Sequence, residues 1–481
     1  MRESQEKLQR IVDLHTHVFN ARHLPLESII RNALGNWSSL LAVGIAKLLY
    51  ELTGSDGEKA EFARLKAEHA NALIAHEGVG EPDYIDSICN ITEHQVRHGV
   101  TQKGVLEAGL AAALRELDGI DYALDGWSGE PDPDELERID SLAPEAMPAW
   151  ARRVVKRALR RMTDLIRPNE NSIIDNYAEF FFTLLASEEV ILQRLRDAYG
   201  ETPAPMEFVH YMMDMELAYP GRRPPRYELD VRRARMLELA RNNQDLHGFF
   251  AFDPRREDCV GLAKKALEEG FLGFKFYPAM GYRPHADEHY SDRIEAFYDL
   301  CLEEDAPIFA HCTPVGFESS HLSGRLADPV HWLEVLKERS TLRLCLGHAG
   351  GMSAPKRNPI SAGWAASSES EWTKGNYAWQ VVDLCVRYPN VYCEVGHLED
   401  LLKDDGMICF EQNLRRAREA GGDFGFMDKI AYGSDWHMQA MVNSARPYLG
   451  LFMELFEKEE WRDYRECFFW RNAYAYLRLP R

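Results

Sequence analysis

Several features that mark other protein classes are missing from this sequence of 481 residues. No Cys-x-x-Cys pair occurs among its nine cysteines, which excludes a zinc ribbon and a thioredoxin-like redox motif. No apolar run approaches the length of a membrane span, and the opening residues MRESQEKLQR are too polar for a secretory signal. We therefore expect a cytoplasmic protein that has no membrane partner and keeps its cysteines reduced.

Positive charge is also scarce. The 56 Lys and Arg residues are outnumbered by 77 Asp and Glu residues, which gives a formal net charge of -21. Because binding to phosphate backbones needs a positive surface, no nucleic-acid partner is expected. Hydrophobic residues make up 45% of the chain, enough to fill the core of a large globular protein.

Short apolar runs, each followed by a segment of helical periodicity, recur in the second half of the chain. Together with a first run near the N-terminus they predict eight strands, at residues 11–19, 208–215, 248–253, 271–277, 307–312, 342–348, 391–395 and 430–435. Strand and helix in alternation predict a parallel sheet of the α/β class. Eight repeats favour a closed (β/α)8 TIM barrel over an open doubly wound sheet.

A long stretch after the first predicted strand breaks this alternation. We expect residues 1–20 and 206–481 to form the barrel, and residues 21–205 to form a large, mainly helical insertion. Insertions at this point emerge on the face where barrel active sites lie, so this one is interpreted as a cap over the pocket. The alternative is a packing or dimerisation module, which would be compatible with a homo-oligomer.

Four histidines and one aspartate fall at the ends of predicted strands. His15 and His17 are two residues apart, so their side chains point to the same side of the first strand. His311, His348 and Asp435 end three later strands, and all such ends meet around the mouth of a barrel. Neutral imidazoles with one carboxylate suit Zn²⁺ or a similar divalent ion. Taken singly, each residue is equally explained as a hydrogen-bonded core histidine or a helix N-cap.

Lys275 ends the fourth predicted strand between two aromatic residues. A buried lysine is costly to keep charged, so it should be paired, deprotonated or modified. One interpretation is a salt bridge to Asp253 or Glu394. The other is a carboxylated lysine that bridges two metal ions.

The order of these residues resembles the amidohydrolase superfamily, which has His-x-His on strand one, Lys on four, His on five, His on six and Asp on eight. The looser loop pattern and the final segment around Asn472 look like the amidohydrolase-related branch that includes aminocarboxymuconate semialdehyde decarboxylase. The resemblance covers about residues 8–20 and 206–481. It implies that one metal ion is bound by His15, His17, His311 and Asp435.

The resemblance leaves the number of metal ions open, with zinc as the first candidate. In mononuclear members the strand-six histidine, here His348, polarises substrate or water. In binuclear members it binds a second ion, with a carboxylated lysine, here Lys275, between the two. The run Lys-Phe-Tyr-Pro-Ala is similar to the strand-four segment of dihydroorotases and favours two ions, whereas most decarboxylase relatives lack this lysine.

The expected activity is hydrolysis of a C–N or C–O bond in an amide, cyclic amide or lactone by a metal-activated water. Asp435 should accept the proton of the water, and His348 should stabilise the oxyanion. The expected substrate is an anionic small molecule, held by Arg283 and lined by Tyr282 and Trp436. The alternatives are a metal-dependent decarboxylase of a conjugated or aromatic carboxylic acid and a barrel that binds without catalysis.

Overall fold

The computed structural model describes residues 8–26, 28, 49–50, 53–54, 183–218, 225–320, 322–352, 361–402, 405–436 and 445–480. The chain divides into two compact units. One consists of Met1–Val18, Leu192–Ala218 and Leu229–Arg481, and the other of Phe19–Ile191 and Tyr219–Glu228. Most of the predicted insertion at residues 21–205 lies outside the described residues.

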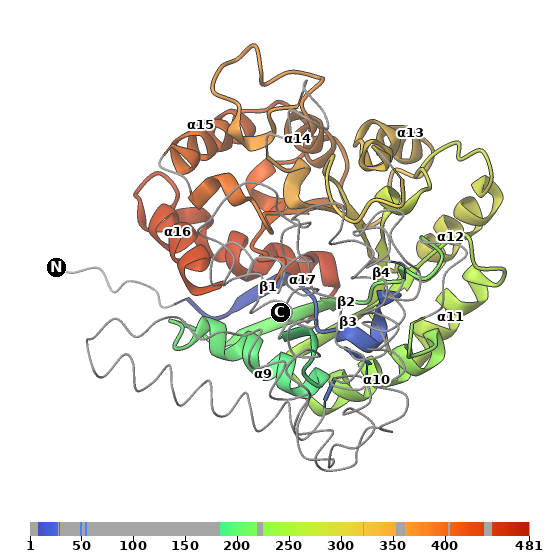
Figure 1. The fold of residues 1–481 in the computed structure, drawn as a ribbon. Helices are drawn as coiled ribbons and strands as arrows, with labels where there is room; N and C mark the ends of the chain where they lie inside the picture. Colours follow the sequence, from blue (N-terminus) through green and yellow to red (C-terminus); the bar gives the residue numbers. More distant parts are fainter. Residues whose placement is uncertain are drawn as a thin grey trace, which may run out of the picture. The chain divides into compact units, whose positions relative to one another are not determined.

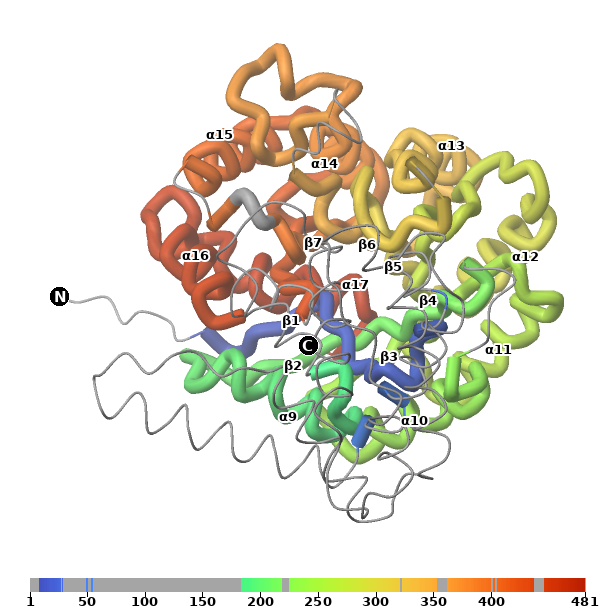
Figure 2. Tube along the Cα trace, viewed as in Figure 1, coloured from blue at the N-terminus to red at the C-terminus, as the bar shows by residue number. Residues whose placement is uncertain are grey.

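The first unit contains one sheet of eight parallel strands that follow one another in sequence order (Figure 2). The strands are β1 (Ile11–Thr16), β2 (Met206–Tyr211), β3 (Leu246–Phe252), β4 (Gly273–Phe276), β5 (Ile308–His311), β6 (Leu344–Gly347), β7 (Val391–Glu394) and β8 (Ile430–Ala431). Backbone hydrogen bonds from Leu14 to Tyr432 (3.1 Å) and from Asp435 to His15 (2.7 Å) join the last strand segment to the first. The predicted (β/α)8 barrel is confirmed.

Helices surround the strands on the outside (Figure 1). They are α9 (Glu188–Tyr199), α10 (Leu229–Asn242), α11 (Cys259–Glu269), α12 (Ser291–Glu303), α13 (Val330–Glu338), α14 (Tyr377–Arg387), α15 (Gly406–Arg418), α16 (Ala445–Glu457) and α17 (Asn472–Leu477). Local signals fix their ends. The Asn376 side chain accepts the Ala378 N–H at the start of α14, and Gly270 ends α11 with a φ of 114° that glycine adopts without strain.

The barrel interior is filled by aromatic side chains below the mouth. Tyr211 packs against Phe249 and Phe309, with ring centroids 4.9 Å and 4.1 Å apart. Tyr476 of α17 packs against Phe249 and Tyr392 from the opposite end. These rings close the core of the barrel, so polar side chains at the carboxyl ends of the strands are left to form a site at the mouth.

All eight predicted strands extend beyond the observed carboxyl ends, five of them by one residue and three by three or four residues. β1 ends at Thr16 rather than at residue 19, β2 at Tyr211 rather than at 215, and β8 at Ala431 rather than at 435. The reason is that the segments beyond these ends are also buried, as Met212 and Met215 are, so the apolar pattern continues after the ladder of hydrogen bonds stops.

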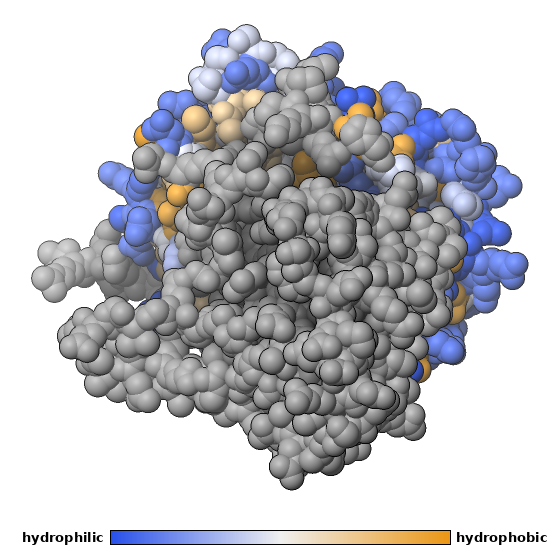
Figure 3. Space-filling model, viewed as in Figure 1, coloured by the Kyte–Doolittle hydropathy of each residue, from blue (hydrophilic) through white to orange (hydrophobic). Residues whose placement is uncertain are grey.

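The described surface is mainly hydrophilic, with small and scattered hydrophobic areas in the view of Figure 3. Among the described residues the exposed large hydrophobic side chains are Val231, Val315, Val330 and Ile408. None of the helices within the described ranges combines the length and the hydropathy that a membrane span requires.

Candidate metal centre

His15 of β1 and His17, which follows β1, share one carboxylate oxygen. The Nδ1–H of His17 donates to the Tyr211 carbonyl at 3.0 Å, and a carbonyl only accepts, so the His17 Nε2 atom carries a lone pair. The Nδ1 atom of His15 is likewise bonded to Glu394 Oε1, at 2.9 Å. The two Nε2 atoms lie 3.3 Å (His15) and 3.2 Å (His17) from Asp435 Oδ1.

His311, the last residue of β5, and His348, which follows β6, also each have one ring nitrogen bonded to a backbone carbonyl. The Nε2–H of His311 donates to the Val315 carbonyl at 2.6 Å, and the Nδ1–H of His348 donates to the Gly396 carbonyl at 2.8 Å. The remaining ring nitrogens, His311 Nδ1 and His348 Nε2, face each other at 3.1 Å. Both are then unprotonated, and two lone pairs at this distance repel unless a proton or a cation lies between them.

These donor atoms fit a divalent metal ion. Ligands bonded at about 2.1 Å to one ion lie roughly 3 to 3.4 Å from one another, close to the 3.1–3.3 Å separations found here. The ligand atoms of His15, His348 and Asp435 all lie within 4.8 Å of one another, and the three residues are buried. The structure thus brings together all five residues that the sequence singled out, and their role as ligands stays a prediction.

Burial puts these groups in metal-binding protonation states. It lowers the pKa of His15 and His311 well below the usual value, and that of His348 to about 4. Burial alone would raise the pKa of Asp435, but its interactions with the nearby imidazoles of His17 and His348 outweigh burial and lower this pKa. At neutral pH the site therefore offers neutral imidazoles and an ionised carboxylate.

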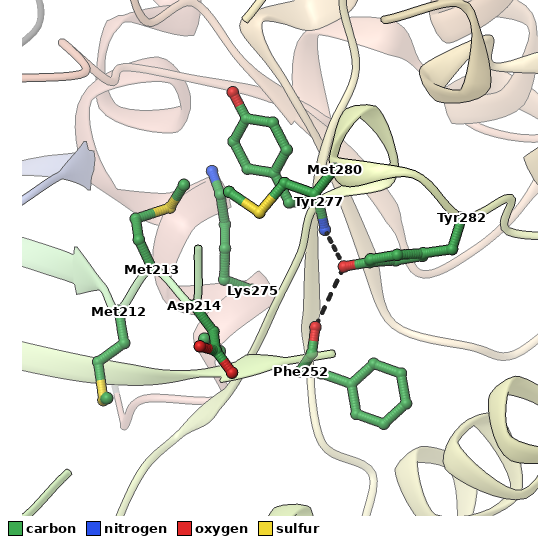
Figure 4. Close-up of a pocket in the computed structure, with 9 residues that line it drawn as sticks. Met212, Met213, Asp214, Phe252, Lys275, Tyr277, Met280 and Tyr282 are labelled. Carbon is green, nitrogen blue, oxygen red and sulfur yellow. Dashed lines mark hydrogen bonds between the residues drawn. The ribbon is translucent and has the colours of Figure 1, made fainter. Parts of the chain in front are cut away.

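Lys275 also reaches the site. Its Nζ atom lies 3.2 Å from His15 Nε2 and 4.2 Å from the Phe309 ring centroid, and burial lowers its pKa to about 8. Asp253 forms its ion pair with Arg255 at 2.6 Å, not with Lys275 as one interpretation expected. Figure 4 shows the Lys275 amino group beside the ends of Met213 and Met280 in the pocket that these residues line.

Glu394 also lies at the site, although the sequence suggested it only as a partner for Lys275. Its Oε1 atom accepts the His15 Nδ1–H and the backbone N–H of His348 at 2.7 Å, and its Oε2 atom accepts the Gly396 N–H. Burial raises the pKa of Glu394, whereas the backbone N–H groups of His348 and Gly396 that its carboxylate accepts lower it. A signal was present, because Glu394 is the penultimate residue of the seventh predicted strand and His348 ends the sixth.

Asp13 was missed altogether. Its carboxylate accepts the backbone N–H of His15 (3.2 Å), the N–H (2.8 Å) and hydroxyl (2.6 Å) of Ser434, and the Tyr199 hydroxyl (2.6 Å). Burial raises the pKa of Asp13 to about 6. The alternation Asp13, His15, His17 along one face of the first strand was the available signal.

The backbone at the site is strained. His348, Ala349 and Asp435 have φ values of 60°, 47° and 60°, in the left-handed region that residues with a Cβ avoid. Each such residue costs on the order of 1–3 kcal/mol, and strain of this kind concentrates at functional sites.

The predicted substrate contacts lie in different places. Tyr282 lines the pocket of Figure 4, where its hydroxyl accepts the Tyr277 N–H and donates to the Phe252 carbonyl. Trp436 is buried and forms a backbone bridge with Thr16. Arg283 pairs with Glu288 at 3.2 Å and is not among the residues that line this pocket. Contact of these residues with a substrate stays a prediction.

Comparison with known proteins gives one family. No curated protein is significantly similar to the chain. A structure of 5-carboxyvanillate decarboxylase from Novosphingobium aromaticivorans with bound manganese has 14% identity, covers 67% of this chain and 92% of its own, and has a TM-score of 0.41. An amidohydrolase from Burkholderia multivorans with bound zinc has 16% identity, covers 62% and 92%, and has a TM-score of 0.40. The family model described as Amidohydrolase matches residues 193–479, more than half of the chain and all of β2 to β8, so the chain belongs to the amidohydrolase family.

Proposed function

We propose that the protein is a metal-dependent hydrolase that cleaves a C–N or C–O bond of an amide, cyclic amide or lactone in a small molecule. One observation carries this proposal. The hydrogen bonds on the outer side of the four imidazoles leave one unprotonated nitrogen on each for the space beside the Asp435 carboxylate. His15, His17, His311 and Asp435 would hold the ion, with zinc as the first candidate.

A bound divalent ion supplies a water whose pKa is lowered to about 7 and polarises the carbonyl under attack. The protein supplies the proton transfers. Asp435 is ionised at neutral pH, and its Oδ1 atom faces the site, so it is placed to accept a proton from the attacking water. The same carboxyl group then donates that proton to the leaving nitrogen or oxygen.

Of the two roles that the sequence left open for His348, binding of a second metal ion is the better supported. Its Nδ1–H is used by the Gly396 carbonyl, and its pKa of about 4 keeps the ring neutral. The Nε2 atom therefore accepts rather than donates, which argues against a hydrogen bond from this atom to an oxyanion. The orientation supports His348 as a further metal ligand and, with it, the arrangement with two ions.

Lys275 completes that arrangement when it is carboxylated. A lysine whose pKa is about 8 has a substantial neutral fraction near pH 7.5, and the neutral amine adds to CO₂ to give a carbamate and a proton. The amino group lies 3.2 Å from His15 Nε2, so an added carboxyl group would lie beside the ligand atoms.

A decarboxylase of a conjugated or aromatic carboxylic acid is the second candidate. The side chains beside Lys275 that bear on it are Met212, Met213, Met280 and Tyr277, although the cavity they line has room for about one water, so an aromatic substrate would require them to move. Thioether groups make favourable contacts with aromatic rings. Two ions with a carboxylated lysine would favour the hydrolase, and one ion with a free lysine would favour the decarboxylase.

The test is elemental analysis of the zinc-loaded protein after free metal has been removed. We expect at least one ion per chain in the wild type and a loss of metal in His15→Ala and Asp435→Ala. His247→Ala, at the other end of the barrel, serves as the control and should keep the wild-type content. Wild-type metal content in both site variants would show that the proposed coordination is wrong. Native mass spectrometry of the same sample reports whether one CO₂ is attached to Lys275.

A further inference from the structure

We propose that Glu394 is a positioning residue that fixes the tautomer of His15 and the placement of His348 at the same time. The inference rests on the proposed metal centre, because it concerns how two of its ligands are held. Glu394 is the last residue of β7 and is completely buried, and it contributes contacts that no other described carboxylate makes to these two histidines.

The first contact sets the protonation of His15. Glu394 Oε1 lies 2.9 Å from His15 Nδ1, which places the ring proton on Nδ1. The Nε2 atom is then left with its lone pair towards Asp435 Oδ1, at 3.3 Å. A carboxylate behind a histidine ligand is a recurrent device for fixing which ring nitrogen is available to a metal.

The second contact sets the position of His348. The same Oε1 atom accepts the His348 backbone N–H at 2.7 Å, while the Gly396 carbonyl accepts the His348 ring N–H at 2.8 Å. Gly396 is itself bonded through its N–H to Glu394 Oε2. Residues 394–396 thus hold His348 by its backbone and its ring, and this helps to offset the strain of its φ of 60°.

Two glycines leave the space that this carboxylate occupies. A Cβ atom at Gly433 would lie 2.2 Å from Glu394 Oε2, and one at Gly396 would lie 2.7 Å from it. Contacts that short do not occur in folded proteins. The slot for the Glu394 carboxylate therefore exists only because both neighbouring positions lack a side chain.

A glutamine in this slot has the right shape and the wrong hydrogen bonds. Three N–H groups converge on the two carboxylate oxygens, whereas an amide has one oxygen. With its oxygen at the Oε1 position, the amide NH₂ faces the Gly396 N–H. In the flipped orientation the NH₂ faces both His15 and His348. His15 relieves its own part of that clash by moving its proton to Nε2, the atom assigned to the metal, whereas the His348 N–H still faces the NH₂.

The experiment compares zinc affinity in the wild type, Glu394→Gln and Glu207→Gln, each measured by chelator competition. Glu207 is the matched control, because it also pairs with a histidine, His247 Nε2 at 3.0 Å, but at the start of β2. We expect Glu394→Gln to weaken zinc binding about 10–100-fold, as loss of outer partners of metal ligands does. Glu207→Gln should keep the wild-type affinity.

A second measurement separates positioning from general damage. ¹⁵N NMR of the histidine rings in the zinc-loaded protein should place the His15 proton on Nδ1 in the wild type and shift it in Glu394→Gln. Unchanged affinity and an unchanged tautomer in Glu394→Gln would overturn the inference. Should that variant fail to fold, a wild-type His15 protonated on Nε2 would overturn it by itself. A wild type that binds no zinc would instead overturn the proposed function.

Discussion

Two carboxylate–histidine pairs lie at opposite ends of the barrel and behave differently. Glu394 and His15, at the mouth, are 2.9 Å apart with exposed fractions of 0% and 1%, and burial raises the pKa of Glu394. Glu207 and His247, at the start of their strands, are 3.0 Å apart with exposed fractions of 19% and 17%. There, partial burial is outweighed by hydrogen bonds from His247 and Tyr474, so the pKa of Glu207 is lowered.

The difference between the two ends shows that the buried groups at the mouth lower the stability of the fold. At the partly exposed end hydrogen bonds favour the ionised Glu207 carboxylate, whereas at the buried end desolvation opposes ionisation of the Glu394 carboxyl group. Strained backbone at His348 and Asp435 adds to the cost at the mouth. Active sites tolerate such features because the groups they hold in place do the chemistry.

The largest loss of stability should come from a side chain at Gly433, placed in the space that the Glu394 carboxylate occupies. In Gly433→Ala the new Cβ would lie 2.2 Å from Glu394 Oε2, so we expect a loss of about 3 kcal/mol or more in the free energy of unfolding. In Gly248→Ala, on β3, the nearest atoms belong to the Phe271 ring at 3.3 Å, and a loss of about 1 kcal/mol is expected. Urea denaturation measures both. Equal losses of stability in Gly433→Ala and Gly248→Ala would contradict the expected difference between the mouth and the opposite end of the barrel.

A smaller effect should follow from changing the aspartate beneath the site. Asp13→Asn puts an amide NH₂ against some of the N–H and O–H groups that converge on the carboxylate, so we expect a loss of about 2 kcal/mol. Asp245→Asn removes the half-exposed pair with Arg196 at the other end and should cost less than about 1 kcal/mol. Thermal denaturation compares them, and a smaller loss in Asp13→Asn than in Asp245→Asn would contradict the comparison.

The smallest effect concerns the pH dependence of stability at the partly exposed Glu207. Because the pKa of Glu207 in the folded protein is below its unfolded value of about 4.3, its ionised form favours the folded state. That stability is present above pH of about 4.3 and is lost as the pH falls through the folded pKa. Glu207→Gln should therefore flatten the fall in stability below this pH. Identical acid limbs of the stability curves in wild type and variant would refute this.

Much of the fold followed from the sequence because it depends on repetition. All eight strands overlap the predicted segments, because apolar runs between helical segments are typical of buried parallel strands. Strand ends were less certain. Met212 and Met215 continue the apolar pattern of β2 without belonging to it, because loops at the mouth are buried as well.

The site was predicted only as far as side-chain type and position on a strand allowed. That reasoning found His15, His17, His311, His348 and Asp435, which the structure gathers at the mouth. It could not find the carbonyls of Tyr211, Val315 and Gly396 that orient three of these rings, because the direction of a carbonyl is set by the folded backbone. It could not find the partner of Arg283 either, whose guanidinium pairs with Glu288, and the contact of Arg283 with a substrate stays a prediction.

Anomalous diffraction at the zinc edge, from crystals of the zinc-loaded protein, tests the central claim most directly. The account predicts a peak at bonding distance, about 2.0–2.2 Å, from His15 Nε2, His17 Nε2 and Asp435, with His311 binding through Nδ1. A peak bonded to the Glu394 carboxylate or to His15 Nδ1, or no peak at the mouth of the barrel, would contradict it.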